Sequence, residues 1–385
     1  MRRPVKIILG IVIGLTVLCI GSILVFYVTN QSLPTHSKDP ATLTDADQAL
    51  FYEANHLRKE LGGQVWPGWE LVKYIPFVAY NEAYTFLMGM ADPANGWSLP
   101  GKAEVRGAAW EAVGGTNANP AGIYRQPVQD AGRAIGAFTV RIGETWAASL
   151  PTYEWYQIEF FNGMRQQFPP VVRDIFPYAL ARNTMLGGSD RYIASLLHEA
   201  FHAYQATEAF DRLIAAENTA HLEGSYPWDD AQSEQAWKSE IDYLFKAVKS
   251  TSLDEAKSYA RQFLAQRQAR RSATSLSASL VDYERQREWL EGLAKYVELS
   301  AVHVAAQSVS YKPLEAAGFK DYASFEPYYN MQLDEVGNLT NQKDEVLFYY
   351  TGMAQAMLLD RLLPGWKDRA LKSAFLEDLL AEGLR

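Results

Sequence analysis

Cysteine is almost absent from this sequence of 385 residues, which has one, Cys19. A single cysteine excludes a disulfide within the chain and a metal site built on cysteine thiolates. The sequence also lacks an excess of basic residues, because 36 lysines and arginines face 45 aspartates and glutamates and the formal net charge is −9. Since no basic stripe is visible, we expect no nucleic acid partner.

Histidine is the nitrogen ligand that remains for a metal, and the sequence has six histidines. Two of them belong to His198-Glu199-Ala200-Phe201-His202, which matches the His-Glu-x-x-His signature of zinc hydrolases. Residues i and i+4 lie on one face of a helix, so His198 and His202 can bind one ion, with Glu199 beside it as general base. A chance match on a core helix is the alternative, but a buried charged glutamate costs free energy unless it is paired.

The amino terminus combines a basic segment, residues 1–6, with an uncharged segment, residues 7–28. The uncharged segment is long enough to cross a bilayer as a helix. The positive-inside rule places residues 1–6 in the cytoplasm and the bulk of the chain outside. We therefore predict a single-pass protein of the cell membrane with an uncleaved signal anchor. A cleaved signal peptide is the alternative, but residues 29–31 offer no small-residue cleavage site.

Residues 29–43 are polar, contain two prolines and are typical of a linker. We treat the remainder, residues 44–385, as one extracytoplasmic domain, since no repeat or second linker divides it. The scarcity of cysteine in an external domain favours a bacterial surface protein.

Strand signals precede the histidine helix and helical periodicity follows it, which indicates an α+β fold with a small sheet near the amino terminus and a mostly helical carboxy-terminal part. Before the histidines we expect a helix at 44–61, strands or a buried helix at 71–90, mostly loop at 92–119, strands at 122–128 and 136–142, and a helix at 152–168. After them we expect helices at 231–249, 253–269, 277–308, 343–362 and 366–383. Ser189 or Asp190 is the expected N-cap of the histidine helix.

A catalytic zinc site usually has three protein ligands and an open position, so the two histidines need a third ligand. The metzincin extension is excluded, because it requires glycine and histidine where this chain has Gln205 and Glu208. His221 and Glu223 are candidates, although their segment is typical of a helix that ends in a turn.

Glu291 is a further candidate for the third ligand. Its segment predicts a helix with one apolar face, and Glu291 lies on or beside that face. An ordinary amphipathic helix with Glu291 in water is the alternative.

The stretch Glu291-Gly292-Leu293-Ala294-Lys295-Tyr296 resembles the Glu-Gly-x-Ala-x-Tyr element that some gluzincin metallopeptidases combine with His-Glu-x-x-His. This resemblance implies a zincin fold, a bound Zn²⁺ and Glu291 as the third ligand. The spacing departs from the family, because 88 residues separate His202 from Glu291. Residues 210–280 would then be an inserted helical section that loops out and returns.

A second stretch, Tyr349-Tyr350-Thr351-Gly352, resembles the Tyr-x-x-Gly element of gluzincin aminopeptidases, whose tyrosine donates a hydrogen bond to the tetrahedral intermediate. The resemblance implies this role for Tyr349, with Tyr350 as the fallback. A buried aromatic pair at a helix start is the alternative. The Gly-Ala-Met-Glu-Asn element of those aminopeptidases is absent, so exopeptidase specificity is not implied.

These features together predict a membrane-anchored zinc metallopeptidase that hydrolyses peptides or proteins outside the cytoplasm. One alternative is a non-catalytic zincin-fold surface protein with a structural zinc or a binding role. Another is a zinc hydrolase of a different amide or ester bond. A structural zinc site needs a fourth protein ligand, and the sequence suggests none. The sequence specifies neither the substrate nor the oligomeric state.

Overall fold

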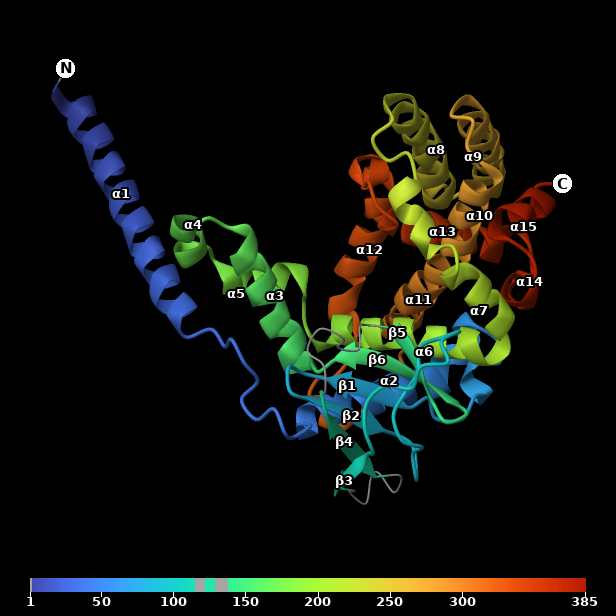
Figure 1. The fold of residues 1–385 in the computed structure, drawn as a ribbon. Coiled ribbons are helices and arrows are strands. Elements are labelled where there is room, and N and C mark those ends of the chain that lie inside the picture. The colour runs from blue at the N-terminus through green and yellow to red at the C-terminus, as the bar shows by residue number, and fades with distance from the viewer. Residues whose placement is uncertain (1, 115–121, 129–137) are drawn as a thin grey trace.

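The computed structural model describes residues 2–114, 122–128 and 138–385, and it has an α+β fold, as the sequence predicts (Figure 1). A small sheet comes first, and most of the chain after it is helical. The predictions for Met1, for 115–119 within the loop segment and for 136–137 at the start of a strand lie outside the described residues.

The described part of the sheet has six strands in the order β3-β4-β2-β1-β6-β5. Their bounds are β1 Phe77–Tyr80, β2 Tyr84–Met88, β3 Glu111–Gly114, β4 Ile123–Pro127, β5 Phe138–Ile142 and β6 Thr145–Pro151. All neighbours are antiparallel except β1 and β6, which run parallel. The strands predicted at 122–128 and 136–142 correspond to β4 and β5, and 71–90 holds two strands rather than a buried helix. β3 lies in the segment predicted as mostly loop. β6 is also missing from the predictions, because its centre has the small residues Ala147, Ala148 and Ser149 and shows little strand propensity.

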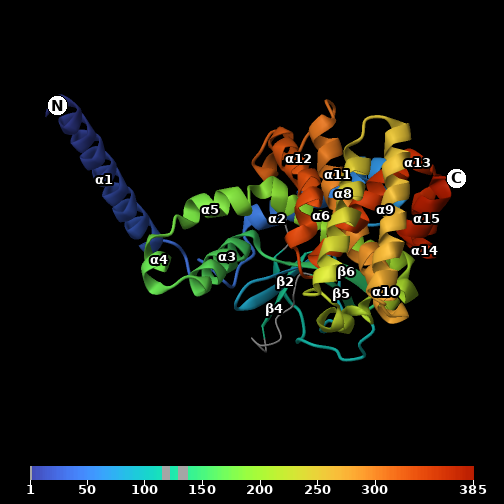
Figure 2. The same ribbon diagram turned by 90° about the horizontal axis from the view of Figure 1, so that it is seen from above.

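Most helices lie to one side of this sheet and extend beyond it, whereas its β4–β3 end projects away from them (Figures 1 and 2). The α-helices are α1 Arg2–Gln31, α2 Asp45–Val65, α3 Tyr153–Gln167, α4 Pro170–Ile175, α5 Tyr178–Met185, α6 Ser189–Glu208, α7 Phe210–Glu217, α8 Ala231–Lys249, α9 Leu253–Ala273, α10 Ala278–Arg287, α11 Leu293–Gln307, α12 Glu326–Glu335, α13 Val346–Leu362, α14 Trp366–Lys372 and α15 Leu376–Gly383. A π-helix, η4 Glu288–Gly292, joins α10 to α11. Short 3₁₀ turns are η1 Trp69–Leu71, η3 Ala220–Ser225, η5 Glu315–Ala317, η6 Ala323–Phe325 and η7 Val336–Asn341.

Most predicted helices are confirmed, although the one predicted at 366–383 is two helices, α14 and α15. Two further differences are informative. The helix predicted at 277–308 is helical throughout but changes to π geometry at η4. The predicted N-cap of α6 is wrong, because Gly188 occupies that position and no side chain caps the helix. Ser189 and Asp190 are instead its first two residues, and the Asp190 carboxylate accepts a hydrogen bond from Ser324 Oγ at 2.9 Å.

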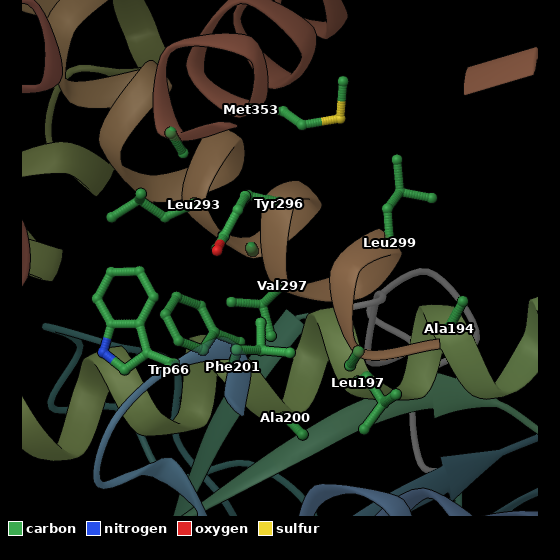
Figure 3. Close-up of a cluster of buried hydrophobic side chains, with 14 of the residues drawn as sticks. Trp66, Ala194, Leu197, Ala200, Phe201, Leu293, Tyr296, Val297, Leu299 and Met353 are labelled. Atoms are coloured by element: carbon green, nitrogen blue, oxygen red, sulfur yellow. The ribbon is translucent and has the colours of Figure 1, made fainter. Parts of the chain in front are cut away.

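The helix α6 lies between the sheet and the carboxy-terminal helices, where it contacts β5, β6, α2 and α11. Residues 192–194 and 196–206 are all buried, as its nearly continuous apolar sequence predicts. Figure 3 shows Phe201 of α6 beside Val297 of α11 and beside Trp66, whose ring centroid lies 4.9 Å from that of Phe201. This packing fixes the position of the histidine helix relative to α11.

Two helices, α8 and α9, form a hairpin that projects from the body of the domain (Figure 1). The hairpin falls within residues 210–280, the section predicted to loop out between His202 and Glu291. The chain returns through α10 to η4, which brings Glu291 back to α6.

The first helix, α1, projects away from the domain, and its residues 14–31 are long and apolar enough to cross a membrane. The segment predicted as a linker is held against the domain. Ser37 donates hydrogen bonds to the Glu82 carboxylate at 2.6 and 2.7 Å, and Asn81 donates one to the Pro40 carbonyl at 2.9 Å. Helix α1 is therefore joined to the domain by a fixed segment.

Candidate metal centre

The structure brings His198, His202 and Glu291 together, although Glu291 is 89 positions beyond His202. The two histidine Nε2 atoms lie 3.1 Å apart, and Oε2 of Glu291 lies 3.4 Å from Nε2 of His198 and 3.3 Å from Nε2 of His202. All three residues are buried, with exposed fractions of 7 or 8%. Among the described residues, they form a group that could hold a metal ion.

The other nitrogen of each imidazole is already engaged. Nδ1 of His198 lies 3.1 Å from a carboxylate oxygen of Glu298, and Nδ1 of His202 lies 2.8 Å from Oε1 of Gln205. The amide of Gln205 is oriented by its NH₂ group, which donates to the carbonyls of Trp289 and Leu290 at 3.2 and 3.3 Å. Both acceptors therefore favour a proton on Nδ1, which leaves the two Nε2 lone pairs directed at the shared point.

The spacing of the three atoms fits a small metal ion. Two ligands about 2.0–2.1 Å from one zinc ion in tetrahedral geometry lie about 3.3 Å apart. The observed separations of 3.1 to 3.4 Å match this value. Two lone pairs and a carboxylate oxygen at such distances repel one another unless a cation lies between them.

The electrostatics of the pocket also favour a cation. Burial by itself lowers the pKa of His198, but Glu291, Glu298 and Glu199 outweigh burial and raise it to about 10. Burial likewise opposes ionisation of Glu291, but the two histidines and Arg287 hold its pKa well below the ordinary range. A proton can supply the positive charge that the site needs, so metal binding would release that proton.

Arg287 fixes the orientation of the Glu291 carboxylate. Its guanidinium donates to Oε1 of Glu291 at 2.9 Å and lies 3.0 Å from a carboxylate oxygen of Glu345. Because Oε1 is occupied in this way, Oε2 faces the histidines.

Two glycines allow the segment that carries Glu291 to meet α13. A Cβ atom on Gly292 would lie 2.5 Å from Cα of Gly352, and one on Gly352 would lie 2.5 Å from the carbonyl oxygen of Glu288. No larger residue fits at either position without a backbone shift. The Glu-Gly and Tyr-x-x-Gly stretches therefore form the two sides of one helix contact. The Glu-Gly side lies in the π-helix η4, and short π-helical segments are frequent at functional sites.

A cleft of about 370 Å³ opens beside the three residues. Its lining includes Glu199, Tyr349, Leu99, Ile214, Glu217 and Thr139. Oε2 of Glu199 is buried and has no hydrogen-bond partner among the described residues, and burial raises the pKa of this carboxyl group. A buried carboxylate oxygen without a partner, next to a cation site, is the arrangement expected of a general base.

The two candidate tyrosines are separated by the structure. Tyr349 lines the cleft, and its ring stacks on His198 with 5.9 Å between centroids. Burial, and then the nearby carboxylates of Glu291 and Glu345, raise the pKa of Tyr349 far above its ordinary value. Tyr350 instead donates a hydrogen bond to Gln332 at 2.9 Å, outside the lining of the cleft. The geometry therefore favours Tyr349 over Tyr350 as the candidate donor to a tetrahedral intermediate.

The alternative third ligands lie elsewhere. His221 is exposed, and its Nδ1 contacts the carbonyl of Asn218 at 2.8 Å. Glu223 lies in the 3₁₀ turn η3 and does not belong to the group of ligand atoms. The alternative of a solvated Glu291 is also wrong, because this residue is 7% exposed.

Three residues that support the ligands were missed from the sequence: Gln205, Arg287 and Glu298. Each has a positional signal once the ligands are known. Gln205 follows His202 by three positions. Arg287 precedes Glu291 by four positions and Glu298 follows it by seven, and all three are helical spacings that share a face.

Comparison of the chain with protein-family models, with curated proteins and with solved structures finds no match.

Proposed function

We propose that this protein is a membrane-anchored zinc metallopeptidase of the gluzincin type, with a zincin fold, that hydrolyses peptide bonds outside the cytoplasm. The observation that carries this proposal is the convergence of two imidazole lone pairs and one carboxylate oxygen beside a buried, unpartnered carboxylate in a cleft. A set of two histidines and one glutamate suits zinc, and catalytic zinc sites commonly have three protein ligands.

His198, His202 and Glu291 would hold the ion. A bound zinc ion would polarise the scissile carbonyl and lower the pKa of water from 15.7 to about 7. Glu199 would accept a proton from the attacking water and deliver it to the leaving amine. The pKa of Glu199 is raised by burial, which suits a group that must both take up and release a proton. The Tyr349 hydroxyl stays protonated because its pKa is raised, so it can donate a hydrogen bond to the developing oxyanion.

A structural zinc is less well supported. Within the described residues, the group that surrounds the ion site has three ligand atoms, whereas a structural site usually has four. A structural role would also leave the buried oxygen of Glu199 and the adjoining cleft unexplained. A hydrolase of another amide or an ester would use the same residues, and substrate profiling separates it from a peptidase.

The anchor is part of the proposal. Helix α1 is long and apolar enough to span a bilayer, although a signal sequence shares these properties. Its basic flank precedes it, so the positive-inside rule places the domain outside the cytoplasm.

The test is the Glu199→Gln variant of the zinc-loaded full chain, assayed on a mixed peptide library. Loss of the general base should lower kcat by about 10²- to 10⁴-fold, while zinc content stays the same. Glu208→Gln is the matched control, because Glu208 is exposed on the same helix and should keep full activity. Full activity in Glu199→Gln would refute the mechanism. Hydrolysis of esters without hydrolysis of peptides would favour the alternative hydrolase.

A further inference from the structure

The segment 168–186, here called the α4–α5 lobe, exposes an unusual number of apolar side chains. Val171, Val172, Leu180 and Met185 have exposed fractions of 76, 40, 63 and 60%. Outside α1, 13 large hydrophobic residues are exposed in the described part of the chain, and four of them fall within this short lobe. A concentration of this kind makes the lobe a candidate interaction surface.

The exposed side chains belong to a fixed structure. Phe176 lies between Phe168 and Tyr178, with ring centroids 4.6 and 5.1 Å away, and Tyr178 is fully buried. The Tyr178 ring in turn lies edge-on against Phe161 of α3, at 6.5 Å. The aromatic residues of the lobe thus point into the domain, while its valines, leucine and methionine point out.

The lobe is attached to the end of α1. Nδ2 of Asn30 donates hydrogen bonds to the carbonyls of Asp174 and Phe176 at 3.1 and 2.8 Å, and Arg165 donates to the carbonyl of Asn30 at 3.4 Å. Asn30 is 8% exposed, whereas nearly all other described side chains of α1 are exposed. Figures 1 and 2 both show α4 beside α1.

This attachment sets the height of the lobe relative to a bilayer. The apolar part of α1 ends at Val28, and the polar residues Thr29 and Asn30 follow it. A helix that spans a membrane changes from apolar to polar residues at the interface with water. Whatever packs on Asn30 therefore lies at that interface, and the fixed linker after α1 keeps it there.

We propose that the α4–α5 lobe is a second membrane contact, in which Val171, Leu180 and Met185 enter the headgroup and upper acyl region of the bilayer that α1 crosses. This inference rests on the anchor in the proposed function and does not depend on the peptidase activity. The occupant is lipid because the lobe packs against the end of α1, the helix that would cross the membrane. Short apolar segments at this level bury roughly 5–10 Å into the interface.

The experiment uses the full chain in phosphatidylcholine–phosphatidylglycerol vesicles, with an environment-sensitive fluorophore on one cysteine and spin-labelled lipids as quenchers. The native Cys19 in α1 reports the anchor. In a Cys19→Ser background, Val171→Cys and Leu180→Cys report the lobe. Leu71→Cys is the matched control, because this leucine is 80% exposed and follows the far end of α2, a helix about 30 Å long.

Positions 171 and 180 should be quenched several-fold more strongly than position 71, and more by lipid labelled near the headgroup than by lipid labelled near the chain end. Cys19 should show the opposite depth preference. If Cys19 is quenched but 171 and 180 behave like 71, the anchor stands and the lobe contact is overturned. If Cys19 itself is not quenched, the anchor fails and this inference falls with it, whereas the Glu199→Gln test is unaffected.

Discussion

Two clusters of buried charge adjoin each other in the helical half of the domain, and their charges are balanced in different ways. The first, here called the arginine cluster, consists of Arg267, Arg270, Arg271, Glu240, Glu284, Glu288 and Glu377. Its carboxylates accept charge-assisted hydrogen bonds of 2.6 to 2.9 Å from the guanidinium groups. The second is the candidate metal centre, where Oε1 of Glu291 is paired with Arg287 but the facing oxygens of Glu291 and Glu199 meet no guanidinium group. Buried carboxylates that are paired with arginines hold helices in place, whereas buried carboxylate oxygens without such a partner can bind a cation.

The π-helix η4 joins the two clusters. Glu288 and Glu291 are three positions apart, both are at most 7% exposed, and their surroundings differ. Glu288 accepts hydrogen bonds from Arg267 at 2.6 and 2.9 Å and from Thr351 at 2.7 Å. Glu288 and Glu291 therefore differ in chemical environment, since they share residue type, burial and helix.

The largest expected effect comes from neutralising these two glutamates in turn. Glu291→Gln should lower zinc affinity by more than the roughly 100-fold that loss of an outer partner costs, and should also weaken the fold, because Arg287 loses a buried partner. Glu288→Gln should keep one zinc per chain but destabilise the fold by about 3–5 kcal/mol, because Arg267 loses a buried partner. Metal analysis and denaturant unfolding measure both quantities. Stoichiometric zinc in Glu291→Gln would remove it as a ligand.

The arginine cluster should also reveal itself in acid. Burial by itself raises the pKa of Glu284, but Arg270 and Arg271 outweigh burial and lower it to about 2, from an ordinary value of 4.5. A lowered pKa contributes stability that is complete above about pH 4.5 and is lost as the pH falls towards 2, an effect on the order of 3 kcal/mol. The difference in unfolding free energy between the natural protein and Glu284→Gln should therefore shrink over this range.

An exposed pair gives the control for the acid experiment. Lys246 and Asp242 form an ion pair at 2.6 Å with about half of each side chain exposed. Asp242→Asn should change stability very little, because exposed ion pairs contribute little. A pH-independent difference for Glu284→Gln would contradict the assignment of that pKa.

A smaller effect is expected from the residue behind His198. Glu298→Gln removes the carboxylate that holds the imidazole, and such outer partners are worth about 10- to 100-fold in metal affinity. Gln205→Leu should weaken binding through His202 in the same way. Competition with a zinc chelator measures both affinities. Unchanged affinity in both variants would mean that these contacts do not support the ligands.

The last expected effect concerns the close contact between Gly352 of α13 and η4, the π-helix that carries a glutamate of each cluster. Gly352→Ala should cost about 1–3 kcal/mol, because its Cβ would meet the Glu288 carbonyl at 2.5 Å and Cα of Gly292 at 2.8 Å. Hydrolysis should fall as well, since the shift separates Tyr349 from Glu291. Gly163→Ala is the control, because nothing lies within 4 Å of its Cβ position in α3, and it should be stabilising by about 0.5–1 kcal/mol. Equal stability of both variants would show that the close approach can relax.

The parts of the site that could be predicted are those with local patterns. Helical spacing places His198, Glu199 and His202, and the Glu-Gly and Tyr-x-x-Gly stretches give Glu291 and Tyr349. The partners Gln205 and Glu298 are ordinary polar residues on helices, and their roles depend on packing between α6 and α11. The π geometry of η4 is equally invisible, because it depends on how α10 and α11 meet α13.

The fold likewise consists of elements that local patterns predict and elements that they do not. Periodic helices such as α8 and α9 are predicted closely, whereas α4 is missing because Pro169 and Pro170 are typical of a helix stop. Pro170 is instead the first residue of a new helix, where its missing N–H is harmless. The α4–α5 lobe, and its contact with Asn30, therefore become visible only in the structure.

The long interval between the two halves of the metal centre determines when the site can form. His202 is synthesised well before Glu291, and the whole α8–α9 hairpin lies between them in the sequence. Contacts between such distant residues form late in folding, because a large loop must close first. In the proposed topology, in which the chain is threaded outwards from α1, an ion would be captured only after translocation and folding. Under the proposed function, a nascent chain would therefore have no hydrolytic activity in the compartment where it is synthesised.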